Sequence, residues 1–207
     1  MAKNTCPSCK QCRREGCKLF LKGERCLTKC SFDKRPVVPG QHGTARKKIS
    51  EYGVQLREKN KVRRNYGLLE KQFRICYEKA AASKEATGWA LLKMLELRLD
   101  NVVYRCGLGS SRAEARQIVN HGHITVNGKK VNIPSYQVKV GDVIAVKESK
   151  QDLDMFKALK ESTKVNTPKW LEFNMESLTG KVLALPERDD IDLNIQEHLI
   201  VEFYARS

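Results

Sequence analysis

The sequence lacks any long apolar run. No stretch approaches the roughly 18 uninterrupted apolar residues expected of a membrane-spanning helix. The first residues, MAKNT, lead to a cluster of cysteines without the apolar region of a signal peptide. We therefore expect a cytoplasmic protein with no membrane partner, in which cysteine thiols stay reduced.

The sequence also lacks the patterns of common catalytic sites. It has no glycine-rich loop of the kind that cradles a phosphate group, and its acidic end, residues 151–207, has no credible catalytic constellation. An enzyme is thus disfavoured. We predict that the protein is not an enzyme and takes no small-molecule substrate.

Acidic residues are scarce in the first third of the chain. Residues 1–75 hold 20 Lys and Arg against 6 Asp and Glu, a net charge of +14, whereas residues 76–150 carry +5 and residues 151–207 carry −4. So concentrated an excess is typical of proteins that bind a polyanion. No segment pairs a basic face with a broad apolar one, so nucleic acid is a better candidate than a membrane surface.

Cysteine, in contrast, is abundant. Six of the eight cysteines lie between residues 6 and 30, among Lys and Arg. Cys9, Cys12, Cys26 and Cys30 form two close pairs with the spacing Cys-x2-Cys-x13-Cys-x3-Cys. This spacing suits the four ligands of a tetrahedral zinc site. Neighbouring cations would help to offset the charge of four thiolates. We predict one structural Zn²⁺ per chain, bound by an N-terminal arm.

Other interpretations of the cysteines stay open. The spacing of Cys6, Cys9, Cys12 and Cys17 approaches that of an iron–sulfur run, but one gap is a residue too long and the following proline is missing. The thiols could also be inert, or form a disulfide framework. Because six cysteines compete for four ligand positions, Cys6 or Cys17 could replace Cys9 or Cys12.

Helices are expected to follow the arm. RPVVPGQHG, residues 35–43, combines two prolines with two glycines and predicts irregular chain, and helical periodicity begins near Ile49. Arg57, Lys61 and Arg64 recur at i, i+4 and i+7, so they share a face. Solvated surface would explain such a face in isolation, but its place in the +14 segment favours contact with phosphates.

The second half of the chain predicts helices followed by a sheet. Apolar spacing indicates one long helix over residues 89–105, with Arg98, Asn101 and Arg105 on one face. Ser111 and Glu114 then have capping-box spacing before a short helix that Gly122 closes.

Turn residues separate the strands that we expect next. Asn127-Gly128 indicates a β-hairpin and Gly141-Asp142 a further turn. Apolar alternation in KVLAL and HLIVEFYA predicts strands that complete the sheet, and the last of these should return to the helical core. Lys169 is the one basic residue next to Trp170 in the sequence. We therefore expect Trp170 to pack in the protein core rather than to stack on a nucleic-acid base.

Several of these segments carry a resemblance. The run SRAEARQIVNHGHITVNGKKVNIPSYQVKVGDVIAV resembles the RNA-binding domain named after the fourth protein of the small ribosomal subunit (S-four). That domain also occurs in other RNA-binding proteins. Five further segments resemble the bacterial or organellar S-four ribosomal protein family itself. They are LELRLDNVVYR, CRREGCKLFLKGERC, RPVVPGQHG, YGVQLREKNKVRRNYG and LIVEFYARS. The similarity extends over nearly the whole chain, which makes it specific.

The resemblance implies a structural protein of the small ribosomal subunit. Members of the family bind small-subunit ribosomal RNA where several RNA helices meet, and they act early in assembly of the subunit. They also contact neighbouring ribosomal proteins. They lie near the path of messenger RNA and influence translational accuracy. Some members repress translation of their own operon. Zinc-bearing members use the pattern of Cys9, Cys12, Cys26 and Cys30, whereas Cys6 and Cys17 depart from it.

The implied fold class is α+β. We expect a zinc-bound arm over residues 1–45, a helical domain over residues 46–90 joined by residues 188–207, and an S-four-type domain with a small antiparallel sheet over residues 91–187. The side chains expected at the RNA are cationic, with two histidines and one asparagine among them: Arg13, Arg14, Lys22, Arg46, Lys47, Lys48, Arg57, Lys61, Arg63, Arg64, Arg74, Arg98, Arg105, Arg112, Arg116, His121, His123, Asn127, Lys129 and Lys130.

An RNA-modifying enzyme that carries the S-four-type domain is the first rival, and the acidic end of the chain without catalytic residues argues against it. A zinc-dependent DNA-binding regulator is the second rival, from another class. The chain has no Cys2His2 finger, and its positive charge extends over long helices rather than one recognition helix. RNA is therefore the preferred partner, although the two histidines, His121 and His123, could equally be structural.

Overall fold

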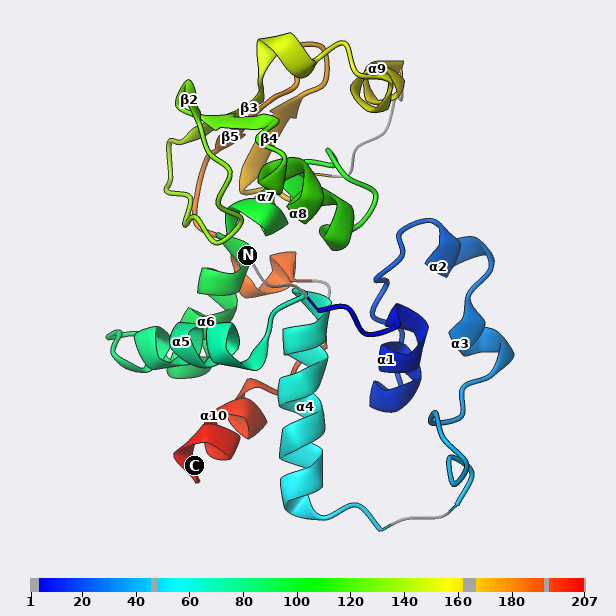
Figure 1. The fold of residues 1–207 in the computed structure, drawn as a ribbon. Coiled ribbons are helices and arrows are strands. Elements are labelled where there is room, and N and C mark those ends of the chain that lie inside the picture. The colour runs from blue at the N-terminus through cyan, green and yellow to red at the C-terminus, as the bar shows by residue number, and fades with distance from the viewer. Residues whose placement is uncertain (1–3, 46–47, 162–166, 192–193, 207) are drawn as a thin grey trace. The chain divides into compact units, whose positions relative to one another are not determined.

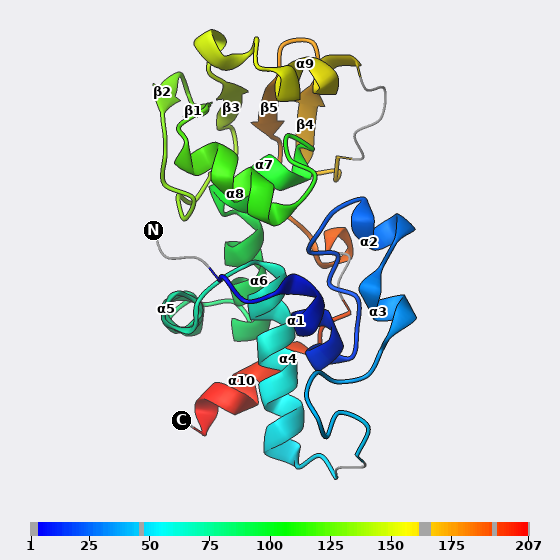
Figure 2. The same cartoon turned by 45° about the vertical axis from the view of Figure 1, so that its right-hand side comes forward.

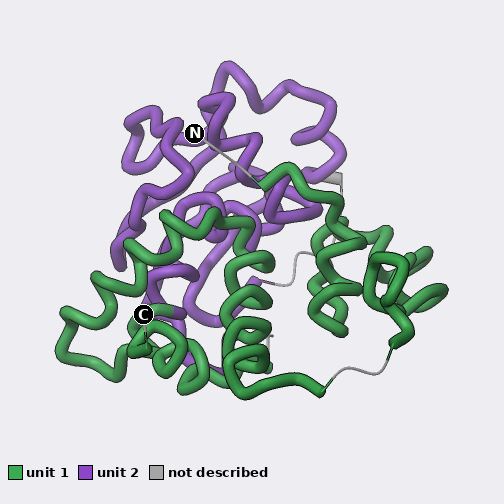
Figure 3. Tube along the Cα trace, turned by 60° about the horizontal axis from the view of Figure 1, so that its bottom comes forward, with its two compact units in different colours: residues 1–91, 193–207 green, residues 92–192 purple. Residues whose placement is uncertain are grey.

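The chain forms two compact units in a computed structural model that describes residues 4–45, 48–161, 167–191 and 194–206. Unit 1 consists of residues 1–91 and 193–207, and unit 2 of residues 92–192 (Figure 1, Figure 3). Helices and an antiparallel sheet occur together, so the fold class is α+β. Among the described residues, we find no helix with the length and apolar character needed to cross a membrane.

Unit 1 begins with an arm of short helices, α1 (Ser8–Glu15), α2 (Arg25–Thr28) and α3 (Ser31–Lys34). The first of these ends at Gly16, which adopts the left-handed conformation (φ 69°) and donates its backbone N–H to Cys12. Irregular chain follows, as the two prolines predict. Arg13 Nε donates to the carbonyl of Val37 over 2.7 Å, which ties this irregular segment back to α1.

The rest of unit 1 is helical. α4 (Glu51–Asn65) starts at Ser50, whose hydroxyl accepts from the backbone N–H of Gly53, and α5 (Glu70–Ala81) buries Phe73 and Ala80. α10 (Glu197–Ala205) packs against α4 (Figure 2). The predicted strand in HLIVEFYA is therefore wrong.

The reason for that error lies in the spacing of the buried residues. Ile200 and Phe203 of α10 are buried three positions apart, which is the spacing of one helix face rather than of a strand. The short apolar run HLIVEFYA is compatible with the spacing of a strand and with that of a helix. Packing against α4 favours the helix.

The single long helix predicted over residues 89–105 is also wrong. The chain forms α6 (Thr87–Glu96) and α7 (Leu99–Arg105), with Arg98 in extended conformation between them (φ −68°, ψ 137°). Here the backbone pairs with a later segment: Leu99 donates to the carbonyl of Tyr136, and Val138 donates to that of Leu97, each over 2.9 Å. These tertiary hydrogen bonds replace the helical ones that apolar periodicity had indicated.

Unit 2 contains one antiparallel sheet of five strands in the order β2-β1-β3-β5-β4. The strands are β1 (Ile124–Val126), β2 (Lys129–Lys130), β3 (Val143–Val146), β4 (Leu171–Asn174) and β5 (Thr179–Val182). Asn127 and Gly128 join β1 to β2 with φ of 50° and 77°, the positive values that a tight hairpin turn of this type requires. The predicted hairpin is confirmed.

The remaining helical elements of unit 2 are α8 (Arg112–Asn120), α9 (Asp154–Glu161), and two short 3₁₀ turns, η1 (Glu148–Lys150) and η2 (Arg188–Asp190). Ser111 caps α8 as predicted, by accepting from the backbone N–H of Glu114 over 3.3 Å. The Glu114 carboxylate accepts from Ser110, rather than from Ser111 as a capping box would require.

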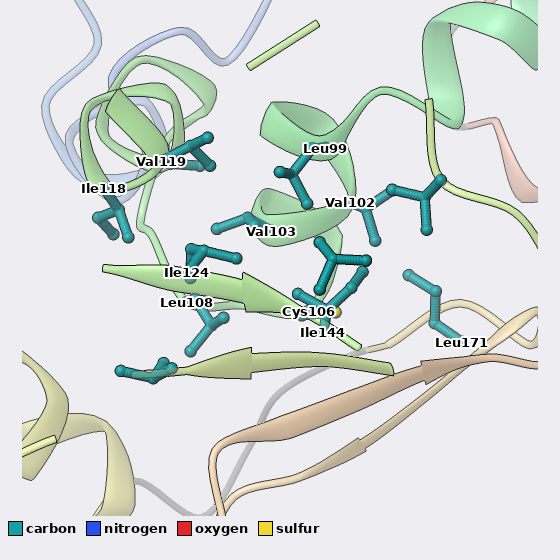
Figure 4. Packing of buried hydrophobic residues seen from close by; sticks show 14 of the residues in the cluster. Leu99, Val102, Val103, Cys106, Leu108, Ile118, Val119, Ile124, Ile144 and Leu171 are labelled. Atoms are coloured by element: carbon teal, nitrogen blue, oxygen red, sulfur yellow. The ribbon is translucent and has the colours of Figure 1, made fainter. Parts of the chain in front are cut away.

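The core of unit 2 lies between the helices and the sheet. α7 supplies Leu99 and Val102, and Cys106 follows at its C-cap; these side chains face Ile124 and Ile144 on the strands (Figure 4). Burying one such aliphatic side chain contributes about 1.5–3 kcal/mol. Trp170 belongs to the same core, so the expectation that it packs is confirmed.

Candidate nucleic-acid interface and metal centre

The arm places two of the predicted zinc ligands in its interior. Cys12 on α1 and Cys26 on α2 are buried, whereas Cys9 and Cys30 are partly exposed. Burial raises the pKa of the Cys12 thiol, a hydrogen bond with the Leu19 backbone lowers it, and the nearby Cys26, Cys9 and Cys17 raise it further. The Cys12 thiol therefore lies near enough to other cysteines of the arm for their charges to affect its pKa.

The donor set has the chemistry of a zinc site. The backbone N–H of Lys22 donates to Cys26 Sγ over 3.4 Å, a contact that would stabilise a thiolate there. However, within the described parts of the chain no three His, Cys, Asp or Glu side chains are gathered closely enough to hold an ion. The residues fit zinc by the type of their side chains and by their spacing in the sequence, and the coordination itself stays a prediction.

On α4, the predicted basic face contacts a carboxylate of the arm. Arg57 Nη1 lies 3.5 Å from Glu15 Oε1, and Arg64 Nη1 donates to the same oxygen. The Glu15 side chain is 1% exposed, whereas those of Arg57 and Arg64 are 30% and 18% exposed. Burial raises the pKa of Glu15, and the surrounding arginines, Arg64 first, oppose that rise.

Two further cations of this helix also have protein partners. Lys61 lies 3.2 Å from Glu58 and donates to the carbonyl of Asn194, and Arg63 lies 3.5 Å from Glu70. If these side chains contact a phosphate, they do so while they also contact acidic or carbonyl groups of unit 1.

In unit 2, two predicted RNA ligands are buried. Arg98 donates twice to the Asp100 carboxylate, over 3.0 and 2.9 Å, and Arg116 donates to the same group over 2.9 Å. The three residues are 2%, 5% and 6% exposed in the order Arg98, Asp100, Arg116. Burial lowers the pKa of Arg116, and the charge of Asp100 raises it. This geometry argues against phosphate contacts by Arg98 and Arg116.

A second polar network joins α6, α7 and α8. Arg105 donates to Glu96 over 3.1 and 3.0 Å, and Asn101 donates to the same carboxylate over 2.6 Å. Arg112 Nε in turn donates to Asn101 Oδ1 over 2.8 Å, while its guanidinium carbon lies 4.5 Å from the centre of the Tyr104 ring. Arg105 and Arg112 are both partly buried, and both have partners within unit 2.

The hairpin carries two of the exposed cations of unit 2. Lys129 and Lys130 form the exposed edge strand β2, and His121 is exposed at the end of α8. The His121 and His123 rings lie 5.8 Å apart between centroids. Asn127 donates to Asp142 over 2.8 Å and accepts from the backbone of Val143, so its amide holds the turn in place.

The other predicted residues of unit 1 divide by exposure. Arg14, Lys22, Lys48 and Arg74 are exposed, Arg13 is partly buried by its contact with Val37, and Arg46 and Lys47 lie outside the described residues. The prediction missed further exposed cations on the same arm, which the concentration of charge in this segment could have indicated: Lys10, Arg25, Lys29, Lys34 and Arg35.

Comparison with known proteins identifies the family. The family model for the ribosomal protein S4/S9 N-terminal domain matches residues 3–96, and that for the S4 domain matches residues 97–144. The chain is 62% identical to small ribosomal subunit protein uS4 of Ruminiclostridium cellulolyticum, 59% to that of Desulforamulus reducens and 60% to that of Clostridioides difficile, in each case over 100% of both chains. The chain therefore belongs to the small ribosomal subunit protein uS4 family.

Proposed function

We propose that this protein binds small-subunit ribosomal RNA where several RNA helices meet, and that it nucleates assembly of the small subunit there. The family consists of structural, non-enzymatic ribosomal proteins. The observation that carries the proposal is the succession of both family domains along one chain that is similar to its relatives over their full length.

The distribution of exposed charge supports RNA as the ligand. Double-stranded RNA has a deep groove that side chains cannot read, so proteins recognise its shape through phosphates and 2′-hydroxyls. The arm presents exposed cations such as Arg14 and Lys22, and the hairpin of unit 2 presents Lys129 and Lys130. Each unit can thus contact phosphates through side chains held on folded elements.

A structural zinc ion in the arm forms part of the proposal. Cys9, Cys12, Cys26 and Cys30 would hold it, and the ion would link α1, α2 and the start of α3. Such a link is suited to an arm with short helices and few buried side chains. Support comes from the spacing of the cysteines and the burial of Cys12 and Cys26.

The remaining partners follow from membership of the family. We propose contacts with neighbouring small-subunit ribosomal proteins, a position near messenger RNA with an effect on translational accuracy, and repression of the protein's own operon through its messenger. The acidic end of the chain is better suited to protein contacts than to RNA contacts, because its net charge from residue 151 is −4.

The decisive experiment is cosedimentation with small ribosomal subunits through a high-salt wash. We expect the protein to remain with the small subunit, and its loss into the soluble fraction would contradict the assignment. In a second assay, purified protein should bind a ribosomal RNA junction more tightly than duplex DNA of equal length at equal salt. Equal affinities would indicate a general polyanion binder instead.

A further inference from the structure

Glu15 occupies an unusual position for an acidic residue in so basic a segment. It is the last residue of α1, a helix that lies beside α4 (Figure 2), and its carboxylate is buried. The same oxygen, Oε1, accepts from Arg57 and Arg64, which lie two helical turns apart on α4. One carboxylate thus joins the arm to two residues of the predicted RNA-binding face.

The contact leaves donors on both arginines. A guanidinium has five N–H donors in a fixed fork, and the contacts with Glu15 involve only Nη1 of each residue. Both side chains also remain partly exposed, Arg57 more than Arg64. Each arginine can therefore contact Glu15 and a phosphate at the same time, and the carboxylate fixes the direction in which the remaining donors point.

We propose that Glu15 is a positioning residue for RNA binding, acting through Arg57 and Arg64. It holds the two guanidinium groups in one arrangement and docks α1 on α4, so that the exposed cations of the arm and the partly exposed Arg57 and Arg64 of α4 form a single RNA-binding surface. This inference rests on the proposed function, because the surface matters only if RNA is the ligand.

The proposal makes a prediction opposite to that of simple electrostatics. Replacing Glu15 with glutamine raises the net charge of the chain by one, which by counterion release alone should strengthen RNA binding. If the carboxylate positions the arginines, the substitution should weaken binding instead. The sign of the effect therefore distinguishes the two accounts.

The test compares two substitutions that change the charge equally. Glu15→Gln removes the buried carboxylate, and Glu24→Gln removes an exposed one on the same arm. We expect Glu15→Gln to weaken binding of the ribosomal RNA junction about tenfold, the scale of one charge-assisted hydrogen bond, and Glu24→Gln to leave it unchanged or slightly tighter. Binding by Glu15→Gln as tight as that by Glu24→Gln would overturn the proposal.

A second comparison separates positioning from a general effect on folding. In the double variant Arg57→Gln/Arg64→Gln, the further substitution Glu15→Gln should not change RNA affinity, because the groups through which Glu15 acts are gone. A full additional loss in that background would show that Glu15 acts by another route. A different result would contradict the proposed function itself: the unmodified protein would bind the RNA junction no more tightly than duplex DNA.

Discussion

Asp100 accepts a hydrogen bond of 2.9 Å from Arg116, a residue sixteen positions later in the chain, and thereby joins α7 to α8 inside unit 2. The same carboxylate binds Arg98. Both arginines were predicted to contact RNA, yet their guanidinium groups are buried and satisfy a single acid. Removing the Asp100 carboxylate would leave the buried guanidinium groups of Arg98 and Arg116 without their shared acidic partner.

The first prediction concerns the stability of this cluster. Asp100→Asn should lower the free energy of unfolding by about 3–5 kcal/mol, the usual effect of breaking a buried ion pair from one side. Urea denaturation followed by circular dichroism measures it. The exposed residue Asp152 provides the control, since Asp152→Asn should change stability little. Equal effects of the two substitutions would mean that the cluster does not stabilise unit 2.

The second prediction concerns the hairpin. Lys129→Gln/Lys130→Gln should weaken RNA binding and flatten its salt dependence by about 1–2 in log–log slope, because two exposed cations are lost from β2. The fold should be unaffected. Arg116→Gln should show the reverse behaviour, with reduced stability as its main effect. If the lysine variant keeps the full salt slope, the hairpin does not face the RNA.

The third prediction is a pH dependence from His123. Burial lowers the pKa of this side chain, and the positive charges of His121, Lys150 and Lys130 lower it further, while Phe156 packs edge-on against its ring. Below the ordinary value of 6.5, the unfolded chain therefore takes up a proton that the folded chain does not. Stability should be complete above pH 6.5 and decrease as the pH falls through the folded pKa.

The measurement is thermal unfolding between pH 7.5 and 5. His123→Gln should remove the part of the pH dependence that belongs to this side chain, whereas His42→Gln, at an exposed position of the arm, should retain it. A pH profile that is identical for the unmodified protein and His123→Gln would refute the assignment.

The fourth prediction concerns the metal. Elemental analysis of protein purified under reducing conditions should find one zinc per chain, and stoichiometric iron with visible absorption would contradict the assignment. A metal site of this kind stabilises a small fold by roughly 10–16 kcal/mol. Cys26→Ser should therefore lose zinc and unfold the arm, which protease sensitivity would report, while unit 2 stays folded on its own core.

Cys76→Ser is the matched control for that experiment. Cys76 lies on α5, away from the cysteine cluster in the sequence, and its replacement should leave the zinc content unchanged. A variant that loses zinc on this change would show that the ligand set differs from the predicted one.

Local signals in the sequence predicted local features well. The Asn127-Gly128 turn, the Ser111 cap and the positive φ of Gly122 (69°) each depend on the chemistry of one or two residues, which is visible in the sequence itself. The helix break at Arg98 was missed, since it depends on hydrogen bonds with residues 136–138, far along the chain.

The candidate site shows the same division. The concentration of positive charge could be counted from the sequence, and it directed the prediction to the arm and α4. Which cations face solvent could not be read from spacing, because the acids that bind them are distant: Glu15 is 49 residues from Arg64, and Asp100 is 16 from Arg116. A cation that has such a partner becomes part of the scaffold, whatever helix face it occupies.

The packing of α10 against α4 has a consequence for the order of events during synthesis. Unit 2 is continuous in sequence and can fold once its last strand has left the exit tunnel, whereas unit 1 must wait for the last residues of the chain. At a translation rate of about 5–20 residues per second, α4 emerges on the order of ten seconds before α10. During that interval the nascent chain lacks the Phe203 ring, which in the finished protein covers Lys59 at 4.6 Å. The N-terminal unit, although made first, is thus the last to be completed.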